Sequence, residues 1–133
     1  HTVVPGMVER GFGRVINIGS DAGRVGSSLE AVYSGAKGGI IAFTKTLARE
    51  VATKGVTVNT VCPGPTDTPA LRKFADSSGE DADKVIGGMA RSVPMKRLGN
   101  PADVAAAVAF FGHDSAEYIT GQTLSVSGGL TMA

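Results

Sequence analysis

The pattern of hydrophobic and polar positions along the chain predicts short strands separated by helices. Three runs rich in β-branched residues, at 14–18, 56–61 and 123–127, predict β-strands. Apolar residues recur at helical spacing over 30–53, and the segment 100–112 opens with Asn, Pro and Asp, which is typical of a helix start. Helices of this length between strands indicate an α/β fold with a parallel sheet.

The long helix predicted at 30–53 has one apolar stripe, which we expect to face the sheet. Gly55 follows it and suits a left-handed helix end. The stripe consists of Ile40, Thr44, Leu47 and Val51, with Phe43 beside it.

The remaining segments give weaker signals. The Gly- and Ser-rich stretch 19–29 predicts a loop, and two short helices are expected at 69–74 and 81–91. Pro63 is expected to end the second strand because proline cannot donate a ladder hydrogen bond. We expect the strand at 14–18 to be buried on both faces. In so thin a sheet, we expect one edge to carry uncovered apolar surface.

Composition indicates one globular domain rather than a disordered or fibrous chain. The 133 residues are 42% hydrophobic and 19% charged. The net charge of +1 gives no reason to expect a nucleic acid or an anionic membrane as partner. The longest apolar run, at 104–111, is too short to span a bilayer. A single cysteine, Cys62, suits a reducing compartment, so a cytoplasmic location is expected, and two histidines give no reason to expect a metal site.

Ser20, Tyr33 and Lys37 are the candidate catalytic residues. Tyr33 and Lys37 are four residues apart near a helix start, so they share one helix face. A lysine ammonium favours the phenolate of a nearby tyrosine, which can then exchange a proton with an alcohol or a carbonyl oxygen. Ser20 follows the first strand, at the sheet edge where α/β proteins build their sites, and its hydroxyl would hold the substrate oxygen.

An isolated Tyr-x-x-x-Lys pair is more often a half-buried tyrosine beside a surface lysine. The joint spacing favours the catalytic interpretation, since Tyr33 follows Ser20 by thirteen residues and the next strand leads into a Cys-Pro-Gly-Pro turn. A serine hydrolase is excluded because no Gly-x-Ser-x-Gly elbow surrounds Ser20 or Ser34.

Four motifs, at 17–23, 33–39, 58–64 and 119–122, resemble the short-chain dehydrogenase/reductase family in their order and spacing. The resemblance implies a Rossmann-like, doubly wound parallel sheet. Residues 1–133 would form the C-terminal half of that single domain, with about three strands and flanking helices.

The resemblance also implies roles for particular residues. Tyr33 would be the general acid/base, Lys37 would bind the nicotinamide ribose, and Ser20 would orient the substrate oxygen. A further group would lie against the nicotinamide of NAD or NADP, with NAD slightly preferred: Pro63, Gly64, Thr66 and Thr68.

No Gly-x-x-x-Gly-x-Gly turn for the dinucleotide phosphates precedes Arg14. About four strands of the family's fold would therefore lie outside this sequence, and we expect the isolated chain to be inactive. The intact parent is expected to be a homodimer or homotetramer that uses the helix at 30–53. The alternative is a catalytically silent fragment that only associates.

Within the family, the segments 20–28, 63–68 and 124–132 are similar to 2-hydroxycyclohexanecarboxyl-CoA dehydrogenases. The expected substrate is therefore a small secondary alcohol or ketone carried as a CoA thioester. The alternative is a 3-oxoacyl-ACP reductase, because these enzymes share most of the general motifs.

Overall fold

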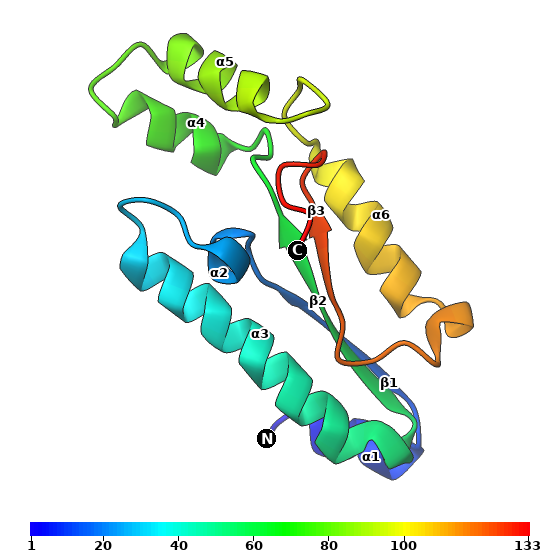
Figure 1. Cartoon of the computed structure of the whole chain (residues 1–133). Helices are drawn as coiled ribbons and strands as arrows, with labels where there is room; N and C mark the ends of the chain where they lie inside the picture. Colours follow the sequence, from blue (N-terminus) through cyan, green and yellow to red (C-terminus); the bar gives the residue numbers. More distant parts are fainter.

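The computed structural model describes residues 1–133 and has three layers (Figure 1). The middle layer is a parallel sheet in the order β1-β2-β3, with α3 on one face and α6 on the other (Figure 1). The predicted α/β class is therefore confirmed. The strands are β1 (Gly13–Ile18), β2 (Val56–Pro63) and β3 (Thr123–Val126).

The helices alternate with the strands along the chain, and the α4–α5 pair lies beyond the carboxyl end of the sheet (Figure 1). Not one of these helices combines the length and the apolar character that crossing a bilayer requires. Their bounds are α1 (Val4–Arg10), α2 (Ala22–Val25), α3 (Ala31–Val51), α4 (Pro69–Asp76), α5 (Ala82–Ser92) and α6 (Pro101–Gly112), with 3₁₀ turns at Ala52–Lys54 and Asp114–Ala116.

The strand that is buried on both faces is β2, and the prediction that β1 would be buried in this way was wrong. Every β2 residue except Pro63 is buried, whereas only Gly13 of β1 is buried and Ile18 remains 45% exposed. The cause is strand order, because β2 has a neighbour on each side and β1 is an edge. The uncovered apolar edge predicted for the sheet is therefore confirmed at β1.

β2 continues through Pro63, beyond the predicted end of the strand, and Pro63 pairs with Val126 of β3. The Thr60 amide donates to Gln122, directly before β3, and the Gly64 amide donates to Val126 of β3. The nitrogen of Pro63 therefore faces the opposite side by strand alternation. On that side β1 has already ended at Ile18. The missing N–H of proline therefore costs the ladder no hydrogen bond.

The buried stripe of α3 is rotated by about one residue from the predicted stripe, because Ile41 and Ala48 are buried while Ile40 and Leu47 are half-buried. Thr44 is fully buried and hydrogen-bonded to Asn17 of β1 and to Thr60 of β2, both at 2.8 Å. A hydrophobic core cluster packs Ala48 and Val51 of α3 against Val56 and Val58 of β2.

The start of α6 agrees with its sequence signal. The carboxylate of Asp103 accepts hydrogen bonds from the Asn100 amide and from the Arg97 guanidinium, both at 2.7 Å. The Arg97 side chain, followed by the Asn100 amide, holds the pKa of Asp103 below its ordinary value. Arg97 therefore stabilises the start of α6 through its ion pair with Asp103.

Asp103→Asn is expected to make unfolding less dependent on pH under acidic conditions. Because the folded state lowers the Asp103 pKa, the carboxylate stabilises the fold above its unfolded-state pKa. That contribution is lost as the pH falls through the folded-state pKa. Thermal unfolding between about pH 6 and about pH 2 should show wild type and variant converging at the acid end. Glu80→Gln, which removes the charge of an exposed carboxylate without an ion pair, controls for the loss of one negative charge.

Candidate active site

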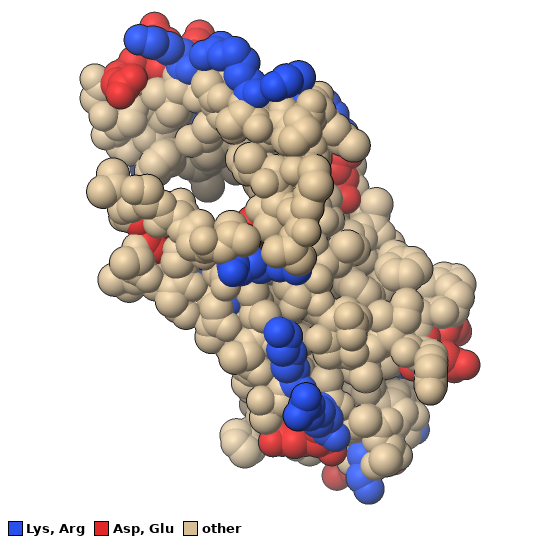
Figure 2. Space-filling view, viewed as in Figure 1, with Lys and Arg blue, Asp and Glu red and all other residues tan.

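A cavity of about 640 Å³ lies at the carboxyl end of the sheet, between the strand ends and α4. This volume is in the range of small-molecule sites. Figure 2 shows the surface hollowed between the α4–α5 pair and the segment that leads into α3. All seven residues predicted from the sequence line this one cavity: Ser20, Tyr33, Lys37, Pro63, Gly64, Thr66 and Thr68.

Volume alone does not single out this cavity. A second cavity of about 640 Å³ lies between β3 and α6, but it contains none of the predicted residues. The first cavity is distinguished by the chemistry of its lining, which combines a phenol, an ammonium group and hydroxyls.

Lys37 is held between the end of β1 and the ring of Tyr33. Its Nζ donates a hydrogen bond to the Ile18 carbonyl at 3.1 Å and lies 5.7 Å from the centre of the Tyr33 ring. Four-residue spacing on α3 places both side chains on one helix face. The Tyr33 side chain remains accessible, at 46% exposure, so a ligand in the cavity can reach it.

Ser20 lies in the short connection from β1 to α2. The sequence predicted a loop over 19–29, whereas the structure forms the single helical turn α2 within it. Its amides return to the preceding carbonyls, since Gly23 donates to Ser20 and Val25 to Asp21. One turn is too short to give a periodic signal in sequence. Ser20 Oγ accepts a hydrogen bond from the Ala22 amide at 3.2 Å, so its own O–H is left to donate.

The segment after β2 forms the opposite wall of the cavity. The Thr66 hydroxyl donates to the Gly64 carbonyl at 2.9 Å, which tightens the turn. Thr68 caps α4 by accepting the Leu71 amide at 3.2 Å. Gly64 approaches the residue after β3 so closely that a Cβ would lie 2.7 Å from the Cβ of Ser127.

Two wall residues at the start of α6, Pro101 and Val104, were not predicted. Topology could have indicated them, because α6 returns to the start of β3. Its first turn must therefore lie near the carboxyl end of the sheet, where the cavity lies.

Cys62, the single cysteine, is buried and does not line the cavity. Burial raises the pKa of the Cys62 thiol, and the nearby Asp21 carboxylate raises it further. A protonated, inaccessible thiol is a poor nucleophile, so the chemistry falls to the cavity residues.

The lining fits the nicotinamide–ribose half of a dinucleotide. Lys37 uses one N–H on Ile18, which leaves two donors for ribose hydroxyls. Apolar walls from Ile18, Pro63 and Leu71 suit a flat ring, and the Thr68 hydroxyl suits an amide. The phosphate-binding Gly-rich turn is not among these residues.

The three-layer fold with its parallel Rossmann-type sheet defines the structural class. A family model described as enoyl-(acyl carrier protein) reductase matches residues 1–131, and the chain belongs to the short-chain dehydrogenase/reductase family. The chain is 45% identical over 130 residues to the 3-oxoacyl-[acyl-carrier-protein] reductase FabG of Vibrio cholerae, covering 98% of this chain and 50% of the relative.

Two further relatives are similar in sequence or structure. The acetoacetyl-CoA reductase of Allochromatium vinosum is 46% identical over 127 residues, covering 96% of this chain and 49% of the relative. A crystal structure of an actinorhodin polyketide ketoreductase with NADPH superposes with a TM-score of 0.87 at 39% identity, covering 96% of this chain and 51% of that chain. The chain thus spans about half the length of the relatives it matches.

Proposed function

We propose that the natural protein containing these residues transfers hydride between a nicotinamide dinucleotide and the secondary alcohol or ketone of an acyl thioester. Residues 1–133 would be the C-terminal part of its single Rossmann domain. The observation that carries the proposal is the convergence of Ser20, the Tyr33–Lys37 pair and the 63–68 turn on one cavity.

In the reducing direction, Tyr33 gives its hydroxyl proton to the carbonyl oxygen as the carbonyl carbon accepts the hydride. The C=O π bond breaks, and one C–H and one O–H bond form. The Lys37 ammonium stabilises the negative charge left on the Tyr33 oxygen. The Ser20 hydroxyl donates to the substrate oxygen and holds it near Tyr33. In the oxidising direction the proton and the hydride each move the opposite way.

Lys37 would hold the ribose hydroxyls, and Pro63, Gly64, Thr66 and Thr68 would lie against the nicotinamide and its carboxamide. Bound NAD or NADP supplies or accepts the hydride, and the protein supplies the proton and the position. NAD is slightly preferred on the family resemblance, while the similarity to a ketoreductase with NADPH supports testing both nucleotides.

A CoA thioester of the 2-hydroxycyclohexanecarboxyl type is the proposed substrate, on the resemblance of 20–28, 63–68 and 124–132. The second candidate is a 3-oxoacyl group on acyl carrier protein, supported by 45% identity to a reductase of that name. α4 lines the cavity through Leu71 and Phe74, and would act as the lid over the acyl chain.

We also propose that the natural protein is a homodimer or homotetramer. The outer face of α3 exposes Val32 and Phe43, which would pack in a helix bundle with a second copy.

The test uses the longest natural chain that contains residues 1–133. Oxidation of NADH and NADPH is followed with acetoacetyl-CoA, 2-oxocyclohexanecarboxyl-CoA and acetoacetyl-ACP. Lys37→Met is expected to lower kcat/KM by about 100-fold or more, since both the charge beside Tyr33 and the ribose contact are lost.

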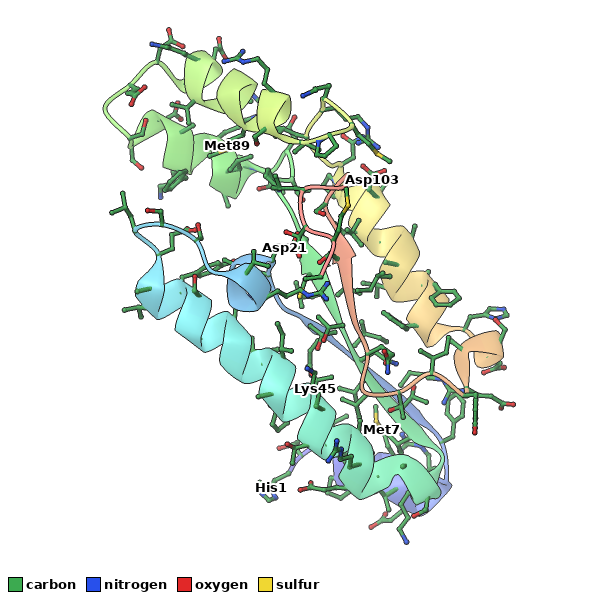
Figure 3. The ribbon with its side chains drawn as sticks, viewed as in Figure 1. His1, Met7, Asp21, Lys45, Met89 and Asp103 are labelled. Atoms are coloured by element: carbon green, nitrogen blue, oxygen red, sulfur yellow. The ribbon has the colours of Figure 1, made fainter.

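Lys45→Met is the matched control, because Lys45 is exposed on the same helix but does not line the cavity (Figure 3). It should turn over like wild type. An active wild type whose rate survives Lys37→Met would contradict the assigned role, and a wild type that reduces none of the three thioesters would contradict the proposed substrate class.

A further inference from the structure

Three side chains join the segment after Ser20 to the last strand. The Ser125 hydroxyl of β3 accepts a hydrogen bond from Arg24 Nη1 at 2.6 Å and donates one to the Asp21 carboxylate. Asp21 directly precedes α2 and Arg24 lies within it, whereas Ser125 is more than one hundred positions away along the chain. The hydroxyl therefore bridges a guanidinium and a carboxylate that have no direct ion pair.

Burial makes this bridge costly to break. Asp21 is only 6% exposed and lies at the carboxyl end of the sheet (Figure 3). Its second oxygen, Oδ2, has no hydrogen-bond partner, so the Ser125 hydroxyl is its one side-chain contact of this kind. A buried carboxylate needs both a donor and a nearby positive charge, and Ser125 and Arg24 supply them.

The turn that this bridge anchors also contacts the candidate catalytic residues. The amide of Ala22, the first residue of α2, donates a hydrogen bond to Ser20 Oγ. Gly23 lies so close to α3 that a Cβ would be 2.6 Å from the Lys37 carbonyl carbon and 2.7 Å from the Gly38 nitrogen. Any displacement of α2 must therefore move Ser20 relative to the helix turn that presents Tyr33 and Lys37.

We propose that Asp21, Arg24 and Ser125 form a positioning network, which sets the place of Ser20 relative to Tyr33 and Lys37. None of the three lines the cavity, so they act through α2 and not on the substrate. The kinetic consequence rests on the function proposed above, whereas the structural consequence does not.

The kinetic test compares Ser125→Ala with Thr123→Val in the longest natural chain. Thr123 lies on the same face of β3, and its hydroxyl is buried without a partner. Removing that hydroxyl therefore breaks no hydrogen bond. Ser125→Ala is expected to lower kcat by about 10- to 100-fold while the KM for NAD(P)H stays unchanged. Ser125→Thr, which keeps the hydroxyl, is expected to restore most of the rate.

Amide hydrogen exchange gives a second measurement that needs no activity. In Ser125→Ala, the amides of Gly23, Arg24 and Val25 should exchange about 10-fold faster, while those of β2 keep their protection. Thr123→Val should leave all of them unchanged.

Unchanged α2 exchange in Ser125→Ala would overturn the network, whether or not a substrate is known. Faster exchange with an unchanged kcat would overturn its positioning role. A wild type inactive on every thioester would count against the proposed function alone, because the exchange comparison still decides whether the bridge holds α2.

Discussion

Tyr33→Phe is expected to lower kcat by about 10²- to 10⁴-fold while the fold stays intact. The substitution removes one oxygen atom, the group that would exchange the proton with the substrate oxygen. The phenyl ring can still pack beneath the Lys37 ammonium, which lies 5.7 Å from the ring centre. Binding of substrate and nucleotide should change little, so the loss should fall on kcat rather than on KM.

The second tyrosine provides the matched control. Tyr118 is 99% exposed and lies on the connection to β3, away from the cavity. Tyr118→Phe removes the same atom and should leave both kcat and KM at wild-type values. Steady-state rates for the two variants, with thermal unfolding to verify folding, decide the matter. A Tyr33→Phe protein that keeps more than about a tenth of the wild-type kcat would rule out Tyr33 as the proton donor.

Gly55→Ala is expected to be the most destabilising single change, lowering the free energy of unfolding by about 3 to 5 kcal/mol. Gly55 has φ +70°, and a Cβ there would lie 2.0 Å from the Gly11 carbonyl oxygen. The left-handed backbone contributes about 1 to 2 kcal/mol of this loss. The rest comes from moving Gly11 away from the start of β2, where the Gly13 amide bonds the Gly55 carbonyl at 3.2 Å.

Gly11→Ala separates the two causes. Gly11 has nearly the same backbone, with φ +67°, but a Cβ there would meet nothing within 4 Å. Its cost should therefore be limited to the backbone term, about 1 to 2 kcal/mol. Urea unfolding midpoints of both variants give the comparison, and equal losses would show that the close approach of Gly55 to Gly11 is not a constraint. Both sites lie at the opposite end of the sheet from the cavity, so the folded fraction should keep its kcat.

Much of the candidate site could be predicted from local sequence. Four-residue spacing on a helix places Tyr33 and Lys37 on one face in any fold, and a Pro-Gly-Pro turn ends β2 wherever that strand lies. The parallel arrangement brings strand ends to one edge, which is why Ser20 was expected there. These inferences depend on neighbours a few residues apart and on the period of hydrophobic positions. The place of the 63–68 turn, by contrast, was implied by the family resemblance.

The sequence by itself determined the strands, the long helices and the left-handed Gly55, because each depends on local backbone preference or periodicity. It also supplied the candidate catalytic trio, through motif spacing and the family resemblance. Only the tertiary structure decided that β2 and not β1 is the buried strand, and that Pro63 can stay in the ladder. It also decided that Ser125 reaches Asp21 and Arg24. Strand order, the side a missing donor faces, and a hydrogen bond across more than one hundred positions all depend on packing between distant segments, and no local pattern encodes that packing.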